Sequence, residues 1–149
     1  MKVKSFFIGI FILSNFLSSC AVEEAANNDE ADKIKSVLVS AYVEGIHMNR
    51  DSVAVRKGFH PDFVMKVYAD DQMIHASLDM WLDRMKLDGV KNPKKIEHEC
   101  GSIDVTGNAA TAKMEIFIDS KHVYTDYFLL YNFEDGWKIV GKIFYSHPE

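Results

Sequence analysis

The stretch Tyr124–Tyr145 reads YTDYFLLYNFEDGWKIVGKIFY, and it decides the fold of this chain. Two runs rich in aromatic and β-branched residues flank Asp135-Gly136, and Asp-Gly between such runs is a strong β-hairpin signal. A two-residue turn at this dipeptide pairs Phe128 with Ile143. Both faces of the hairpin are largely apolar, so we expect one face to be packed and the other to be at least partly covered.

Regular alternation then divides the hairpin side chains between two faces. The first face is predicted to carry Asp126, Phe128, Leu130, Ile139, Ile143 and Tyr145. The second is predicted to carry Tyr127, Leu129, Tyr131, Val140, Lys142 and Phe144. In this register Asp126 pairs with Tyr145, and the preceding strand places Glu115 opposite Asp126. The sequence thus predicts two acids and Tyr145 together on the inner face of a sheet.

The rest of the chain supplies helices first and strands afterwards. Apolar residues at helical spacing predict a helix over residues 29–47, and Asp51 or Ser52 and then Ser77 are typical caps of two shorter helices. Strands are expected at 96–105, 109–118 and 123–132, with a short hairpin near 63–75. The predicted fold class is α+β: three N-terminal helices pack on a strongly curved antiparallel sheet of four main strands plus that hairpin, forming a cone.

The amino terminus has the features of an export signal. Lys2 and Lys4 precede the apolar run 6–17, and Leu17-Ser-Ser-Cys20 follows. This order is typical of a bacterial lipoprotein signal, in which Cys20 receives the lipid, whereas an ordinary secretory signal or an uncleaved anchor is the alternative. We therefore expect a signal peptide at 1–19, a flexible tether at 20–28, a single domain at 29–149, and a lipid-anchored protein in a bacterial cell envelope, at the outer membrane on its periplasmic or surface face.

Charge and cysteine content exclude several classes of partner and cofactor. Removing residues 1–19 takes away two lysines and no acids, so the net charge moves from −5 to −7, which argues against a nucleic-acid partner. With Cys20 lipidated, Cys100 has no disulfide partner. His98 and Cys100 have no second ligand pair nearby, and the chain has no nucleotide-binding loop, so neither a metal nor a cofactor is predicted.

The order of these elements resembles a known superfamily. The segments that carry the resemblance are Ala41-Tyr-Val-Glu-Gly, Phe59-His-Pro-Asp-Phe, Leu78-Asp-Met-Trp-Leu, Ile103-Asp-Val-Thr-Gly-Asn-Ala-Ala, Tyr124-Thr-Asp-Tyr and Gly136-Trp-Lys-Ile-Val-Gly-Lys-Ile-Phe. Over residues 31–147 the chain resembles the nuclear-transport-factor-2-like superfamily, and within it the branch labelled putative lumazine-binding. The resemblance implies a cone around a pocket and frequent dimers through the sheet. It also implies a choice of roles, since the superfamily includes binding proteins, isomerases, cyclases and dehydratases.

The ketosteroid isomerases of this superfamily allow a residue-by-residue comparison. Their oxyanion-binding tyrosine falls on Tyr42, and their protonated oxyanion-hole aspartate falls on Asp126. Their general-base aspartate falls at about Val67, which cannot carry a proton. The resemblance therefore argues against this isomerase chemistry.

The candidate ligand-binding residues are Tyr42, His60, Trp81, Glu115, Asp126, Phe128 and Tyr145. Two acids side by side in a poorly hydrated pocket raise one pKa, which leaves a carboxylic acid that can donate a hydrogen bond. The alternative is that both acids point to water or are neutralised by Lys113, Lys142 or Tyr145. His60 is either an acid or base at the mouth of the cone or a capping histidine.

Three hypotheses follow for the function. The first is a non-catalytic lipoprotein whose cone binds a small, partly aromatic molecule. The second is an enzyme of the cyclase, dehydratase or isomerase type that uses His60 and the Asp126–Glu115 pair with Tyr42. The third is a structural envelope protein that forms a homodimer through Tyr127, Tyr131 and Phe144 and has its pocket filled with side chains. The first is favoured because a proton-shuttling base is missing.

Overall fold

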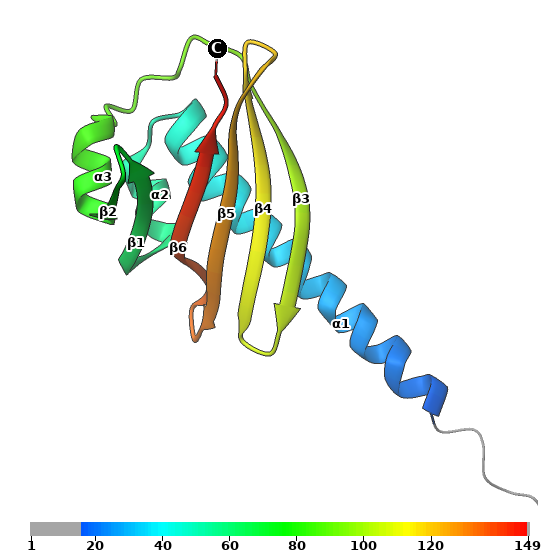
Figure 1. Ribbon diagram of the computed structural model, residues 1–149. Helices are drawn as coiled ribbons and strands as arrows, with labels where there is room; N and C mark the ends of the chain where they lie inside the picture. The colour runs from blue at the N-terminus through cyan, green and yellow to red at the C-terminus, as the bar shows by residue number, and fades with distance from the viewer. Residues whose placement is uncertain (1–15, 149) are drawn as a thin grey trace, which may run out of the picture.

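The computed structural model describes residues 16–148, with side chains from Asn27 onward. A single curved sheet contains the six strands of this part, β1 (Phe59–Ala69), β2 (Gln72–Ser77), β3 (Ile96–Thr106), β4 (Ala109–Ile118), β5 (Lys121–Phe133) and β6 (Gly136–Ser146). They lie in the order β2-β1-β6-β5-β4-β3 (Figure 1). The long strands expected from the sequence are therefore present.

The short hairpin expected near residues 63–75 corresponds to β1 and β2. It is part of the main sheet and not a separate addition, because β1 pairs with β6 in parallel while all other neighbours are antiparallel. This pairing satisfies the backbone groups along the edge of β6, which would otherwise be exposed. The sheet is curved and open, and it has six strands where the sequence suggested four and an addition.

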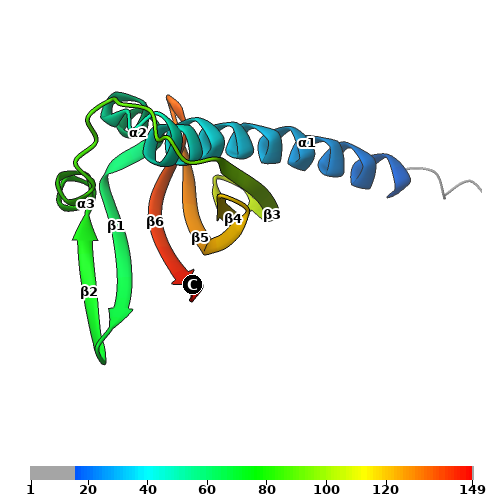
Figure 2. The ribbon, with the colours of Figure 1, turned by 90° about the horizontal axis from the view of Figure 1, so that it is seen from above.

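The helices that the structure describes lie on one side of the sheet (Figure 2). α1 (Phe16–Val37) runs directly into η1 (Leu38–Met48), a π-helical segment, and α2 (Ser52–Gly58) and α3 (Leu78–Met85) follow. Asp51 caps α2 by accepting the backbone N–H groups of Val53 and Ala54, and Ser77 caps α3 by accepting that of Met80. Both predicted caps are confirmed.

The first helix begins earlier than the sequence analysis placed it. Residues 20–28, expected to be a flexible tether, are helical within α1, because Ala21, Glu23, Glu24 and Ala25 are good helix formers. Residues 1–15 of the predicted signal peptide lie outside the described residues, and for Cys20 only the backbone is described. Among the helices of the described part, none combines the length and the apolar character that crossing a membrane requires.

Two features change the strand pairing of the β5–β6 hairpin from the predicted one: the turn lies one residue earlier, and β6 contains a bulge. Glu134 and Asp135 form the turn, so Phe133 pairs with Gly136, and an extra residue, Val140, lies between the pairs Leu130–Ile139 and Leu129–Gly141. A bulge reverses the alternation of every residue beyond it. The predicted faces of β6 therefore hold up to Ile139 and are wrong beyond Val140.

The core lies between the helices and the face of the sheet toward them, which we call the inner face. On the three central strands this face carries Met114, Ile116, Phe128, Leu130 and Ile139, all almost fully buried. The helical side contributes the predicted apolar stripe, and Ile34, Leu38, Ala41, Tyr42 and Ile46 are each at most 1% exposed. We call the opposite face, which carries Tyr127, Leu129, Tyr131 and Ile143, the outer face.

Candidate functional site

A cavity of about 300 Å³ lies between the inner face of the sheet and the helices. Residues of η1, β1, α3, β5 and β6 line it. They are Tyr42, Ile46, His47, Met65, Val67, Trp81, Arg84, Met85, Tyr124, Lys142 and Phe144. Its volume is at the lower end of the range of small-molecule sites, about 300–1,000 Å³. The walls are mainly apolar and aromatic, with a few polar atoms among them.

A buried ion pair lies at one wall of this cavity. Lys142 Nζ is 2.7 Å from Asp126 Oδ1, with the lysine side chain 4% exposed and the aspartate fully buried. Tyr42 Oη donates a hydrogen bond of 2.7 Å to Asp126 Oδ2. Each carboxylate oxygen of Asp126 thus has one strong partner. These contacts make Asp126 the fixed centre of the site.

Burial and charge pull the pKa values of this group in opposite directions. Burial lowers the pKa of Lys142, and the charge and hydrogen bond of Asp126 oppose that effect. Burial raises the pKa of Asp126, while Lys142 and the Tyr42 hydroxyl oppose it. The pKa of Tyr42 is raised well above its usual value by burial and by the Asp126 charge. Tyr42 is therefore a hydrogen-bond donor at all physiological pH values.

Three aromatic rings surround the Lys142 ammonium group. Its Nζ lies 4.8 Å from the centroid of the Tyr42 ring, 5.2 Å from that of Trp81 and 4.5 Å from that of Phe144. These distances are within the range of cation–π attraction, about 6 Å. An ammonium group has three N–H donors, so the ion pair with Asp126 does not use all of them.

His47 adds a second polar group to the cavity wall. Its Nε2 is buried and has no hydrogen-bond partner among the described residues. Burial, and then the charge of Lys142, lowers the pKa of His47 to about 4. The ring packs edge-on against Tyr42, with centroids 4.8 Å apart. The imidazole is therefore neutral at pH 7 and can exchange a proton or a hydrogen bond with a molecule in the cavity.

Four of the residues singled out from the sequence lie in or beside this site. Tyr42 and Trp81 line the cavity, and Asp126 lies behind its wall. Phe128 is buried and packs against Tyr42, with ring centroids 5.0 Å apart, so it supports the site without lining it. The Tyr42–Asp126 contact is the pairing that the resemblance to ketosteroid isomerases implied. Val67, which falls at their general base, does line the cavity.

Glu115 and Tyr145 are not in the cavity, which corrects the prediction for both. Asp126 pairs with Met114, while Glu115 pairs with Thr125 on the outer face. Tyr145 also pairs with Thr125 and is 58% exposed. The Val140 bulge turns Tyr145 outward, and a bulge in β5 adds to the change in register. The proposed Asp126–Glu115 acid pair therefore does not exist.

His60 lies at the start of β1 and is not a cavity residue. Its ring stacks on Phe133 with centroids 4.7 Å apart, and its Nδ1 accepts the backbone N–H of Asp62 at 3.1 Å. This arrangement is the capping role that was the alternative for His60. An acid–base mechanism that depends on His60 and Glu115 consequently has neither residue in the cavity.

Sequence reasoning named Lys113 and Lys142 only as possible neutralising partners of the two acids, and the pairs Lys142–Asp126 and Lys113–Glu115 confirm that alternative. It did not name His47 or Tyr124 as site residues. Lys142 was placed on the opposite face because regular alternation was assumed across Val140. The one available signal was a lysine inside an otherwise apolar strand, since lysine is almost never fully buried without a partner.

Comparison with known proteins agrees with the architecture. The family model described as "Putative lumazine-binding" matches residues 29–145, most of the chain. The chain belongs to this family. Its fold is that of the nuclear-transport-factor-2-like superfamily, as two crystal structures of NTF2-like proteins show. The structure from Shewanella baltica OS155 has a TM-score of 0.67 and 23% identity, and covers 92% of this chain and 100% of that one.

The second crystal structure and one curated relative extend the comparison. The NTF2-like protein from Methylobacillus flagellatus KT has a TM-score of 0.65 and 24% identity, covering 80% of this chain and 94% of that one. A protein named Aldolase FrzH, from Cladobotryum sp., is 29% identical over 126 residues, which are 83% of this chain and 98% of that protein. Membership of the lumazine-binding family is consistent with binding of a small molecule.

Proposed function

We propose that this member of the lumazine-binding family binds a small planar molecule that presents a carbonyl, enolate or carboxylate oxygen to Lys142. The observation that carries the proposal is the position of Lys142 Nζ, which is buried, paired with Asp126 and lies at the cavity wall, because an ammonium group has three N–H donors. Hydrogen bonds from a charged donor are about twice as strong as neutral ones. An oxygen atom of the ligand is the natural acceptor.

The side chains that line the cavity indicate the shape of the rest of the ligand. Trp81, Tyr124 and Phe144 present ring surfaces to the cavity, and Met65 and Met85 provide adaptable apolar contacts. His47 Nε2 and the exposed Arg84 at the wall supply one neutral and one charged polar contact. A flat heterocycle or aromatic acid satisfies all of these groups. In this proposal the helices and the curved sheet enclose the ligand as a cone.

The test uses probes that differ in the oxygen atom. Lumazine and 2-naphthoate provide ring carbonyls and a carboxylate, and naphthalene-2-sulfonamide provides a neutral ring of similar size. Isothermal titration calorimetry should detect binding of the first two by the purified protein. The double variant Lys142→Met/Asp126→Asn should weaken that binding about 10- to 100-fold, because a hydrogen bond from a charged group contributes about 1.5–3 kcal/mol.

The double substitution avoids leaving a buried charge without its partner. Lys66→Met is the matched control, because Lys66 lies on β1 and is exposed on the side away from Met65 and Val67. This control should bind the probes like the parent protein. Equal affinity of the parent and the double variant for both oxygen-bearing probes would show that Lys142 is not the recognition group.

A second candidate function is carbon–carbon bond chemistry of the aldol type at the same cavity. Two observations favour it: the similarity to the protein named Aldolase FrzH, and the presence of an amine and a neutral imidazole in one apolar cavity. Lys142 would pass a proton to Asp126 and attack a ketone carbon, and Asp126 would return the proton to the hydroxyl group of the adduct, so that water leaves and an iminium ion remains. His47 Nε2 would then take the α-proton, and the resulting enamine would add to an aldehyde.

Reductive trapping tests this second candidate. Incubation with cyclohexanone and borohydride should convert an iminium ion to a secondary amine, and peptide mass spectrometry should locate the added mass on Lys142. Lys66 is the internal control for nonspecific modification of exposed lysines. Labelling that is no faster at Lys142 than at Lys66 contradicts the iminium mechanism, while the binding proposal can still hold.

We further propose that Cys20 carries a lipid that anchors the protein in a bacterial cell envelope. The support is the order of charge, apolar run and Leu-Ser-Ser-Cys in residues 1–20. Expressed in a bacterium, the parent protein should fractionate with membranes, and Cys20→Ser should not. Cys100→Ser, which changes a half-buried thiol in β3, is the control and should remain with the membranes. Membrane association of Cys20→Ser equal to that of the parent would refute the anchor.

We also propose a homodimer through the outer face of the sheet. Tyr127, Leu129, Tyr131 and Ile143 are all about half exposed there and lie on adjacent strands. A second copy has the same apolar patch, so the two can pair about a twofold axis.

A further inference from the structure

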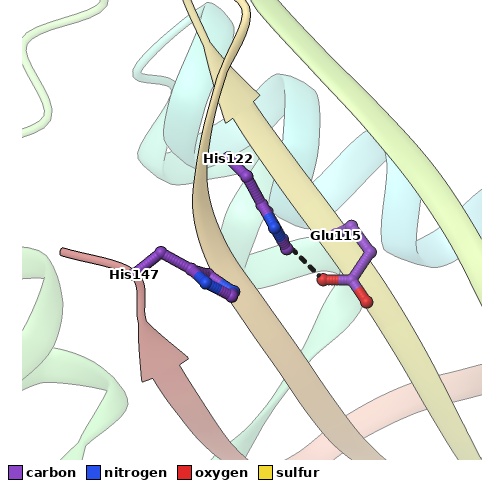
Figure 3. A group of neighbouring side chains, drawn as sticks. All are labelled: Glu115, His122 and His147. Carbon is purple, nitrogen blue, oxygen red and sulfur yellow. Dashed lines mark hydrogen bonds and ion pairs between the residues drawn. The ribbon is translucent and has the colours of Figure 1, made fainter. Parts of the chain in front are cut away.

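A second cluster of polar side chains lies on the outer face, on the opposite side of the sheet from the cavity. Glu115 of β4, His122 of β5 and His147 just beyond β6 point toward one another (Figure 3). Their ligand atoms all lie within 4.8 Å of one another. His122 Nε2 is 2.8 Å from Glu115 Oε2, and the two imidazole rings have centroids 3.7 Å apart.

Two bulges bring the histidines to this face. Ile116 pairs with Tyr124 and Phe117 with His122, so Val123 is an extra residue in β5 and His122 lies on the face opposite to Tyr124. The Val140 bulge in β6 likewise turns Tyr145 and then His147 outward. The backbone N–H of His147 donates to Val123 O at 2.9 Å, which holds the chain end beside β5. Bulges often re-aim side chains next to functional sites.

From this geometry we propose that Glu115, His122 and His147 bind a divalent transition-metal ion, with Zn²⁺ as the preferred metal. Two imidazole nitrogens and one carboxylate oxygen are ligands that suit zinc and its neighbours in the first transition row. Tetrahedral zinc with bonds of about 2.0–2.2 Å holds its ligand atoms about 3.3–3.6 Å apart. The three ligand atoms lie within 4.8 Å of one another, so the rings and the carboxylate must rotate to reach that spacing.

The neighbouring side chains are arranged as supports for such a site. Lys113 Nζ lies 2.6 Å from Glu115 Oε1, which leaves Oε2 directed toward the histidines. Thr125 Oγ1 is 2.9 Å from His147 Nε2 and donates to Glu115 Oε2, and a metal ion would replace both of these contacts because they use the ligand atoms themselves. Hydrogen bonds from outer residues commonly orient metal ligands. With three protein ligands, a fourth position remains for water or a small anion.

Access from solvent is open. The side chain of His122 is 34% exposed and that of Glu115 is 16% exposed, and the helices of the described part lie on the other side of the sheet (Figure 2). An ion can therefore enter without unfolding the sheet. The site and the cavity lie on opposite faces of the sheet, because the side chains of adjacent residues in β5, Thr125 and Asp126, point to opposite faces.

The experiment is a zinc titration of the purified full-length chain, followed by calorimetry and by native mass spectrometry. We expect one Zn²⁺ per chain. His122→Ala and His147→Ala should each lower the affinity for zinc by at least about tenfold. Removal of residues that only support metal ligands already lowers metal affinity about 10- to 100-fold. His75→Ala is the matched control, because His75 is an exposed histidine of β2 outside the cluster. It should bind zinc like the parent protein.

Cobalt absorption and thermal unfolding provide two further tests of the proposed metal site. Co²⁺ in place of Zn²⁺ should give the intense visible absorption of a four-coordinate site, and His147→Ala should abolish it. His147 lies beyond the last strand, so this variant should have the same thermal unfolding midpoint as the parent protein without metal. Zinc affinity unchanged in both histidine variants, or reduced equally by His75→Ala, would overturn the proposed site.

Discussion

Lys142 and Asp126 show how a charged pair survives in an apolar interior. The two side chains are almost fully buried, and the carboxylate also accepts the Tyr42 hydroxyl. Replacing a whole buried pair by neutral groups is often nearly neutral for stability, whereas removing one partner leaves an uncompensated charge. The pair therefore adds little net stability, and its main effect is to hold the ammonium group of Lys142 at the cavity wall.

Substitution of Lys142 alone and substitution of the whole pair should therefore have different effects on the free energy of unfolding. Lys142→Met should lower the free energy of unfolding by about 3–5 kcal/mol, because Asp126 then remains buried without its counter-ion. Lys142→Met/Asp126→Asn should recover most of that loss, because the amide oxygen of the introduced asparagine can still accept the Tyr42 hydroxyl. Urea unfolding at pH 7 measures both values. A double variant as unstable as the single one would contradict the buried-pair interpretation.

The low pKa of His47 predicts how the stability of the protein depends on pH. Its folded-state pKa of about 4 lies below the ordinary value of 6.5, so the unfolded state binds the proton more tightly. The stability associated with neutral His47 is complete above pH 6.5 and is lost as the pH falls toward 4, by up to about 3 kcal/mol. His47→Phe should flatten that part of the profile of urea midpoint against pH.

The matched control for His47 is a histidine that is exposed in the folded protein. His75→Phe should retain the slope of the parent protein between pH 6.5 and 4. Glu115 titrates in a lower window, because Lys113, Thr125 and His122 outweigh its burial and hold its pKa at about 2. Its own stability contribution is thus lost below pH 4.5, largely outside the His47 window. A profile of His47→Phe with the parental slope would refute the assignment.

At the scale of elements, the Val140 bulge in β6 sets both candidate sites. Ile139 faces inward, Val140 and Gly141 both lie opposite Leu129, and Lys142 then faces inward again. The same shift directs His147 outward. Because Val140 is accommodated as a bulge, Lys142 and His147 lie on faces opposite to those that unbroken alternation from Ile139 would give them.

Deletions in β6 test this account. Removing Val140 leaves Lys142 facing inward and His147 facing outward, so the variant should fold with a loss of about 1–2 kcal/mol. Removing Ile143 reverses every residue beyond it, so that Phe144 turns outward and Tyr145 turns inward. That variant should be the less stable of the two by urea unfolding. Equal stabilities would contradict the assigned faces.

At the scale of the whole molecule, the exposed outer face supports the proposed dimer. Leu129→Lys places a charge in the centre of the apolar patch, where leucine is 55% exposed. Light scattering coupled to size exclusion should show a dimer for the parent protein and a monomer for this variant, because burial of an unpaired charge is costly. Its thermal stability as a monomer should change little.

Val53→Lys is the control for this dimer prediction. Val53 is an exposed apolar residue of α2, on the helical side of the molecule. A lysine there should leave the dimer intact. A parent protein that is monomeric at high micromolar concentration, or a Leu129→Lys variant that remains dimeric, would contradict dimerisation through the outer face.

The sequence predicted the elements well because their signals are local. Helical spacing from Ile34 to Ile46, the Asp51 and Ser77 caps, and the turns between the last four strands each depend on a few neighbouring residues. The resemblance to the lumazine-binding family rested on the same segments, and the family model confirms it. These features also correctly placed Tyr42 and Asp126 together.

The sites could not be predicted in the same way, because they depend on register. The bulge at Val123 has no glycine or proline beside it, and the one at Val140 has Gly141 as a weak local marker, yet each reverses the face of every residue beyond it. The sequence alone thus determined that this chain is a helical layer on a curved sheet with an apolar interior. Only the tertiary structure decided that Lys142 and His47 line the cavity while Glu115, His122 and His147 meet outside, because strand pairing across the sheet selects the face on which each side chain lies.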